Sequence, residues 1–187
     1  YGLWAKEDST LRLDHCDISY ARNSNYGDGG LEINTDDAQV RNCHIHHNEH
    51  DGLRISSNFE RTIHTTLTNV DVTDSGQYGV HLESNHGTTS VTWDGGSISR
   101  NGYAGVYGYT NLSNIYPTLK NVTISQNGSL GSYYYQEKGI NFKDPESGIH
   151  PVLDNVTFTG NTGGVMTWYC DGNITARNLV ATGNDGS

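Results

Sequence analysis

Residues 40–55 read VRNCHIHHNEHDGLRI and hold four of the nine histidines of the chain. The pattern of an Asn, a small residue, a polar residue and an apolar residue returns along the sequence. Its apolar positions lie 27, 27, 26, 26, 34 and 23 residues apart. They are Ile18, Ile45, Val72, Ile98, Ile124, Phe158 and Ala181. A fixed period of this kind indicates about seven copies of one unit, with one long insertion.

Each unit contains three short alternating segments separated by turns rich in Asn, Gly and Ser. This is strand patterning, and it leaves no room for a helix. It predicts an all-β parallel solenoid of about seven three-strand coils, in which neighbouring coils pair at ~4.8 Å. An antiparallel sandwich is the competing all-β fold, but it does not place the same residue type at the same position of every repeat.

The domain organisation follows from the same repeat. We expect residues 1–187 to form one β-helix domain. The chain starts inside a third strand and stops part-way through a coil, and open solenoid ends expose strand edges that proteins usually cap. We therefore expect this chain to be a fragment of a longer β-helix.

Two columns of Asn recur at the corners of the predicted coils. The first contains His15, Asn42, Asn69, Gly95, Asn121, Asn155 and Asn178. The second contains Ala21, Asn48, Ser75, Asn101, Asn127, Asn161 and Asn184. Asn tolerates the left-handed backbone of a corner, and its amide can bond to the next coil. We interpret both columns as structural asparagine ladders.

The unit at residues 40–55, echoed by LKNVTISQN at 119–127 and LDNVTFTGNTGGV at 153–165, resembles the repeat of right-handed parallel β-helix proteins of the pectate-lyase-like class. The resemblance covers nearly the whole chain. It implies the fold, and it implies that catalytic groups sit on the strand that follows the variable loop. It leaves the function open, because the class contains lyases, glycoside hydrolases, uronate epimerases, tailspikes, adhesins and surface proteins without activity.

Composition restricts the partners. The chain has 21 Asp+Glu against 11 Lys+Arg, for a net charge of -10, which argues against nucleic acid and anionic membranes. No stretch approaches the length of a membrane-spanning helix, so membrane insertion is not expected. The low hydrophobic content of 33% suits the thin core of a solenoid in a secreted or cell-surface protein. The sequence does not specify an oligomeric state.

Cys16 and Cys43 are separated by one repeat and fall at an inward position, so we expect them to stack in the core. A disulfide between neighbouring strands is geometrically allowed. Two reduced thiols acting as small apolar residues are the favoured alternative. Cys170 has no evident mate.

The Gly-led third strand differs from the other two, whose outward positions are mostly Thr and Ser. Its outward columns gather acids, bases and aromatic rings, which can bind the faces and hydroxyls of sugar rings. We predict a polysaccharide groove on this face. The substrate-binding candidates are Trp4, Tyr26, His50, Tyr78, Tyr103, Tyr109, Tyr134 and Trp168. The catalytic candidates are Glu32, Arg54, His81, Glu83, Tyr107 and Lys143.

Three functions remain open. In a polysaccharide lyase or related uronate enzyme, Arg54 or Lys143 neutralises the sugar carboxylate and His81 or Tyr107 removes the neighbouring proton. In a glycoside hydrolase, Glu32 and Glu83 form the carboxylate pair, although two coils separate them by roughly 10 Å.

The third function is a non-catalytic glycan-binding rod, such as a tailspike, adhesin or cell-surface solenoid, in which the aromatic residues matter most.

The histidines of the opening stretch do not converge as one ligand set. His44 and His46 share the face of the second strand, whereas His47 falls at a turn and His50 in a loop. We interpret His44 and His46 as structural or exposed side chains and predict no metal site. We predict no cofactor and leave Ca²⁺ open as an alternative, although the sequence contains no clear acid cluster to bind it. His50 and Asp51 stand at the entrance of the predicted groove.

Overall fold

The computed structural model describes residues 2–22, 29–130, 138–144, 148–170 and 172–185, with backbone only for residues 144 and 166–170. These residues form strands without a helix, and none of their segments is a helix that could cross a membrane. The strands are Leu3–Ala5 (β1), Thr10–Asp14 (β2), Asp17–Ser19 (β3), Gly29–Ile33 (β4), Asp37–Arg41 (β5), His44–His46 (β6), Asp51–Asn58 (β7), Thr62–Thr73 (β8), Val80–Asn85 (β9), Thr88–Ser99 (β10), Val106–Asn111 (β11), Asn114–Lys120 (β12), Thr123–Ser125 (β13), Ile140–Asp144 (β14), Gly148–Ile149 (β15), Val152–Asp154 (β16), Thr157–Thr159 (β17), Met166–Cys170 (β18), Thr175–Arg177 (β19) and Val180–Thr182 (β20).

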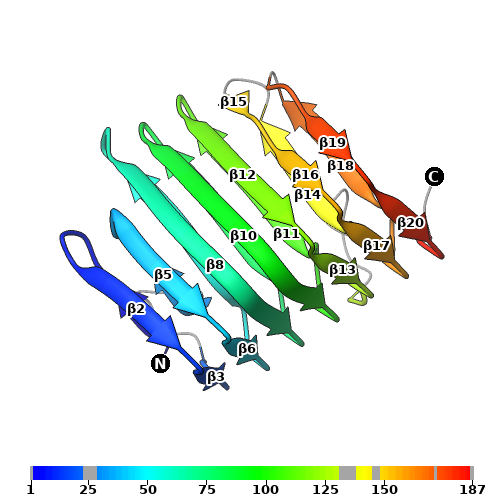
Figure 1. Cartoon of the computed structure of the whole chain (residues 1–187), viewed down its shortest axis with the longest axis horizontal. Coiled ribbons are helices and arrows are strands. Elements are labelled where there is room, and N and C mark those ends of the chain that lie inside the picture. Colours follow the sequence, from blue (N-terminus) through cyan, green and yellow to red (C-terminus); the bar gives the residue numbers. More distant parts are fainter. Residues whose placement is uncertain (1, 23–28, 131–137, 145–147, 171, 186–187) are drawn as a thin grey trace.

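All of these strands pair in parallel with the equivalent strand of the next coil, as Figure 1 shows. Sheet A is the seven-stranded sheet of order β1-β4-β7-β9-β11-β14-β18, and sheet B contains the other thirteen strands. The described residues make about six complete turns rather than seven, because the coils at both ends are incomplete. The first contributes only β1, and the last contributes β19 and β20 without a following strand of sheet A. The architecture is the predicted parallel solenoid.

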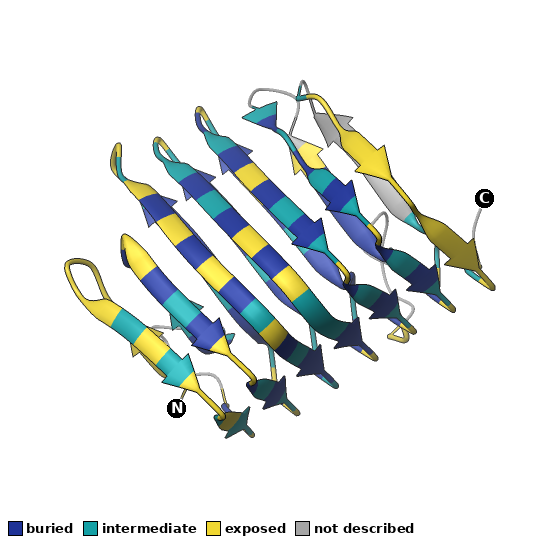
Figure 2. Cartoon of the chain, in the orientation of Figure 1, coloured by how far each residue is buried: buried dark blue, intermediate teal, exposed yellow. Residues whose placement is uncertain are grey.

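The core is a single column of apolar side chains between the two sheets. Inward and outward residues alternate along each strand, which Figure 2 shows as alternating buried and exposed bands. The largest fully buried side chains are Trp93, Phe142 and Phe158. Phe142 requires Gly108 on the neighbouring strand, since a Cβ at position 108 would lie 2.5 Å from Cδ1 of the Phe142 ring. A large core side chain in one coil is therefore accommodated by a small residue in the neighbouring coil.

One corner of the coil uses a left-handed residue in every turn. Its φ angles run from 50° at Asn42 and Asn69 to 78° at Gly95. Side-chain amides bond between coils along this corner, from Asn69 to Asn42 at 3.3 Å and from Asn155 to Asn121 at 2.7 Å. Asn and Gly accept this backbone at low cost, which explains their recurrence.

The second corner holds a buried chain of asparagines. The Nδ2 group of Asn101 donates to Oδ1 of Asn127 at 2.9 Å, Asn127 to Asn161 at 3.0 Å, and Asn161 to Asn184 at 2.8 Å. The left-handed residue is the one before each Asn, for example Arg100 with φ 57°. This differs from our expectation of a left-handed Asn, because the amide must point inward to reach buried backbone groups.

Cys16 and Cys43 lie next to each other as free thiols, Cys43 buried and Cys16 half-buried. The backbone N–H of Cys16 donates to Sγ of Cys43 at 3.4 Å, and the Cys43 thiol donates to the carbonyl of Arg41 at 2.9 Å. Burial raises the pKa of the Cys43 thiol. The pair fills the core in the manner of small apolar residues. The side chain of Cys170 lies outside the described part.

Candidate functional site

The outer face of sheet A carries one continuous ladder of polar and aromatic residues. The Cα register runs Trp4, Glu32, Arg54, His81, Tyr107, Asn141 and Thr167. Neighbouring members are one strand spacing apart, ~4.8 Å. As far as Asn141, each member follows the leading Gly of its strand by two residues, as the sequence predicts. Counted in the same way from Gly164, the sequence predicts Met166 as the last member, whereas the register places Thr167 there.

The error at the last strand is a slip of one residue. Val165 occupies the place held by Gly139 in the coil before, so Met166 pairs with Ile140 and Trp168 pairs with Phe142. This register describes the backbone of β18. The prediction that Trp168 binds substrate concerns a side chain outside the described part, and it stays a prediction.

His81 and Asp51 form the most specific contact on this face. Nδ1 of His81 lies 2.9 Å from Oδ2 of Asp51, whose other oxygen accepts the backbone N–H of Tyr78 at 3.2 Å. Asp51 is 2% exposed and the His81 side chain is 17% exposed. A buried carboxylate beside Nδ1 holds the proton there and leaves Nε2 of the neutral ring as an acceptor. This arrangement suits a general base.

Two tyrosines pack against His81, and a third tyrosine packs against one of these two. The rings of Tyr78 and Tyr107 stack with centroids 4.4 Å apart, and His81 meets them edge-on at 5.5 and 5.1 Å. Tyr103 packs against Tyr78 at 5.5 Å. Burial, reinforced by Tyr107 and Asp51, raises the pKa of the Tyr78 phenol, which stays neutral. Tyr78 is 8% exposed, so it supports the imidazole more than it offers a surface to a ligand.

Arg54 is the centre of a charge cluster beside His81. Its guanidinium bonds to Oε2 of Glu83 at 2.5 Å, with side-chain exposures of 22% and 24%. Burial acts to lower the pKa of Arg54, but Glu83, Glu32 and Asp51 outweigh it and the pKa is raised. Glu83 is thus engaged by a cation, and Glu32 stands beside Arg54 in the ladder rather than facing Glu83.

Comparison with known proteins agrees with this geometry at the level of the fold. Residues 1–90 match the family model described as a right handed beta helix region. The chain is a right-handed parallel β-helix. A search of curated proteins finds no match.

Among solved structures, the β-helix is similar to the A-module of the mannuronan C-5 epimerase AlgE6 from Azotobacter vinelandii, with 19% identity and a TM-score of 0.46. The match covers 96% of this chain and 55% of that one, so the β-helix spans about half the length of that module.

The other candidates are spread along the β-helix. At the N-terminal end Trp4 is 43% exposed and lies under the ammonium group of Lys6, 4.5 Å from the ring centroid. Tyr109 is 43% exposed, Lys143 is exposed, and His50 bonds through Nδ1 to Nε2 of Gln77 at 2.8 Å. Tyr26, Tyr134 and the Trp168 side chain lie outside the described part.

Sequence reasoning found His81 but missed the role of Asp51. The repeat did contain this signal. Asp51 begins strand β7 and His81 lies on the neighbouring strand β9, so the two residues belong to adjacent coils. What the sequence did not provide was the side-chain direction that joins them.

Proposed function

We propose that this β-helix binds an extended polysaccharide across the outer face of sheet A and cleaves a uronate-containing chain by elimination, with His81 as the base. The observation that carries the proposal is the His81–Asp51 hydrogen bond within a cluster of tyrosine rings. An oriented imidazole on a face rich in aromatic groups combines a proton acceptor with a surface for sugar rings.

The length of the face supports an extended ligand. Trp4 lies on β1 and Tyr109 on β11, four strand spacings away in sheet A. At ~4.8 Å per spacing this is a span of roughly 20 Å, long enough for several sugar rings. Both rings are 43% exposed. We propose that these two rings bind sugars on either side of the reacting one. His81 lies on β9, between β1 and β11, and contacts the reacting sugar.

The chemistry of the residues favours proton removal over hydrolysis. Glycoside hydrolases use two carboxylates that face one glycosidic bond. Here Glu83 is bonded to Arg54, while the residue with an oriented proton acceptor is a histidine. Proton removal is easiest beside a carboxylate group, and uronates provide such a proton. A uronate polymer also fits a secreted or cell-surface protein.

The proposed step begins when Nε2 of His81 takes the proton from the carbon next to the sugar carboxylate. The electron pair of that C–H bond forms a carbon–carbon double bond, the bond to the glycosidic oxygen breaks, and this oxygen takes a proton from solvent. Arg54, adjacent to His81 in the ladder, binds the carboxylate and shares its charge between the ligand and Glu83.

The experiment is an ultraviolet absorbance assay with acidic and neutral polysaccharides. Elimination creates an unsaturated uronate that absorbs, and hydrolysis creates reducing ends without that absorbance. Wild type is compared with His81→Ala and Asp51→Asn, and with His64→Ala as a control on the exposed face of sheet B. We expect absorbance to rise on a uronate polymer with wild type and the control, and to be lost in the first two variants.

Two other outcomes are informative. Deuterium from heavy water entering the polymer without absorbance would uphold proton removal by His81 and replace elimination with epimerisation. Reducing ends without absorbance, or no reaction with any polymer while glycan binding persists, would overturn the elimination proposal in favour of a hydrolase or a binding rod.

A further inference from the structure

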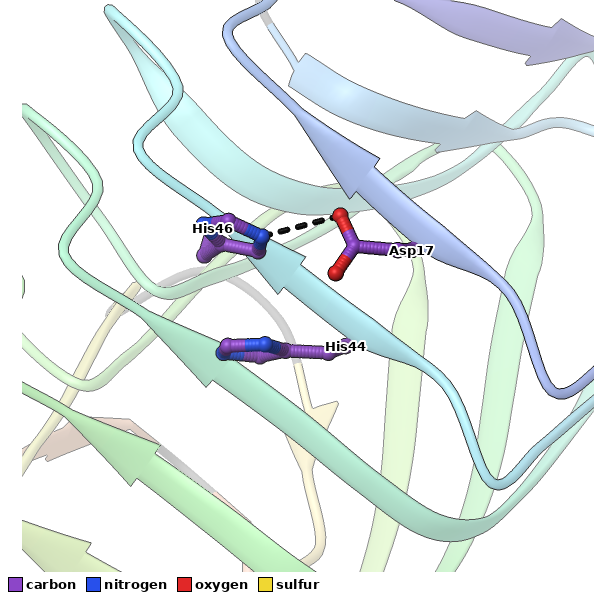
Figure 3. Close-up of side chains that lie close together, drawn as sticks. All are labelled: Asp17, His44 and His46. Carbon is purple, nitrogen blue, oxygen red and sulfur yellow. Dashed lines mark hydrogen bonds and ion pairs between the residues drawn. The ribbon is translucent and has the colours of Figure 1, made fainter.

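A second cluster of chemically active side chains lies on sheet B, away from the His81 face. Asp17 on β3 pairs in register with His44 on β6, and His46 follows two residues later on the same strand. Residues two apart on a strand project from the same side, so both imidazoles stand beside the Asp17 carboxylate, as Figure 3 shows.

The three side chains already converge. One ligand atom from each lies within 4.8 Å of the others. The two imidazole rings stack with centroids 4.2 Å apart and an interplanar angle of 22°. Nε2 of His46 lies 2.9 Å from Oδ1 of Asp17. The set therefore presents a carboxylate and two imidazoles to one point.

We propose that Asp17, His44 and His46 bind one divalent transition-metal ion of the Zn²⁺ type. Two imidazoles and one carboxylate form a donor set that Zn²⁺ and its neighbours in the series accept, with a further position open to water. Hard ions such as Mg²⁺ and Ca²⁺ prefer sets made of oxygen alone. The chemistry of the ligands thus selects the class of ion.

The neighbouring groups can orient the ligands. Nδ1 of His46 lies 2.7 Å from Nδ1 of His47, and Nε2 of His44 lies 3.0 Å from Oγ1 of Thr73. When a metal replaces the proton on Nε2 of His46, Nδ1 must carry the proton and donates it to His47. A histidine ligand usually has such an outer partner, which fixes its tautomer.

The ion would join two successive coils, because Asp17 and the two histidines come from adjacent strands β3 and β6. An ion that binds the folded chain but not the unfolded chain stabilises the fold by mass action. We therefore assign the site a structural role at the N-terminal end of the β-helix, independent of glycan chemistry on sheet A.

The test is titration of metal-free protein with Zn²⁺ by calorimetry and with Co²⁺ by visible absorbance, each followed by a thermal melt. We compare wild type with His44→Ala, His46→Ala and Asp17→Asn. His64→Ala serves as the matched control, since His64 is exposed on sheet B outside the cluster. Melts without metal verify that every variant is folded.

We expect one ion per wild-type chain and a higher melting temperature with Zn²⁺. Removing a ligand should weaken binding by more than the ~10- to 100-fold loss typical of an outer partner, and the control should bind normally. The proposal is overturned if wild type binds no stoichiometric ion, if the three variants bind as wild type does, or if His64→Ala weakens binding as much as they do.

Discussion

Replacing Asn127 with Ala tests the buried asparagine ladder that holds successive coils together. The Asn127 side chain is fully buried. Its Oδ1 accepts the backbone N–H and the Nδ2 group of Asn101 at 3.1 and 2.9 Å. Its Nδ2 donates to the carbonyl of Ile98 and to Oδ1 of Asn161, both at 3.0 Å. Asn127→Ala removes all four bonds.

The expected loss follows from the groups left behind. Nδ2 of Asn101 keeps the carbonyl of Val72, and Oδ1 of Asn161 keeps the backbone N–H of residue 127. The backbone N–H of Asn101 and the carbonyl of Ile98 lose the bonds that Asn127 gave them. A buried polar group without a partner costs ~1–3 kcal/mol, so the two groups together give an expected destabilisation of about 2–6 kcal/mol. This is a large share of the ~5–15 kcal/mol that stabilises a typical domain.

The assay is urea unfolding followed by circular dichroism, with Asn121→Ala as the control. Asn121 lies at the exposed corner, where its amide bonds to Asp94 and Asn155. The control loses exposed bonds and places Ala at φ 53°, for an expected cost of ~1–2 kcal/mol. Equal losses in the two variants would refute the argument that burial makes the inner ladder decisive.

Three further outcomes are expected. Gly108→Ala places a Cβ 2.5 Å from the phenyl ring that fills the core beside it, and overpacking should lower the free energy of unfolding by ~1–3 kcal/mol; an unchanged urea midpoint would contradict the packing. Glu83→Gln removes the charge that neutralises Arg54, so uronate oligosaccharides should bind more tightly in calorimetry, whereas weaker binding would place Glu83 itself in contact with the ligand. The hydrogen bond from Arg100 lowers the pKa of the Asp74 carboxyl, so the pair stabilises the fold above pH ~4 and this contribution is lost as the pH falls through the lowered pKa. The difference in free energy of unfolding between wild type and Asp74→Asn should therefore shrink as the pH falls. A difference that grows in acid would contradict the stabilising role of the ionised Asp74.

The sequence predicts the fold because period, turn residues and strand alternation all repeat. The recurring apolar positions from Ile18 to Ala181 pair in register along sheet B through β20. The one-residue slip in β18 arose because Val165 lies where Gly139 leads the strand before it, so the leading glycine no longer indicates the register. Repetition thus predicts the register wherever the leading glycine keeps its place.

The candidate sites were less predictable, because they depend on side chains that meet between coils. His81 and Asp51 are 30 residues apart, and Asp17 and His46 are 29 apart. The repeat places each pair on adjacent coils, but rotamers decide whether the atoms meet. Tyr78 was expected to face a ligand, but its ring stacks on the ring of Tyr107. Stacking of two large rings buries apolar surface and so stabilises the fold.

The most direct test of the account is equilibrium binding of uronate oligosaccharides to two matched variants. Tyr109 on β11 and Tyr116 on β12 are both 43% exposed, but Tyr109 belongs to sheet A and Tyr116 to sheet B. We predict that Tyr109→Ala weakens binding by more than 1 kcal/mol, roughly fivefold or more, and that Tyr116→Ala leaves it unchanged. Equal losses in both variants, or a loss only in Tyr116→Ala, would contradict the assignment of the outer face of sheet A as the polysaccharide-binding face.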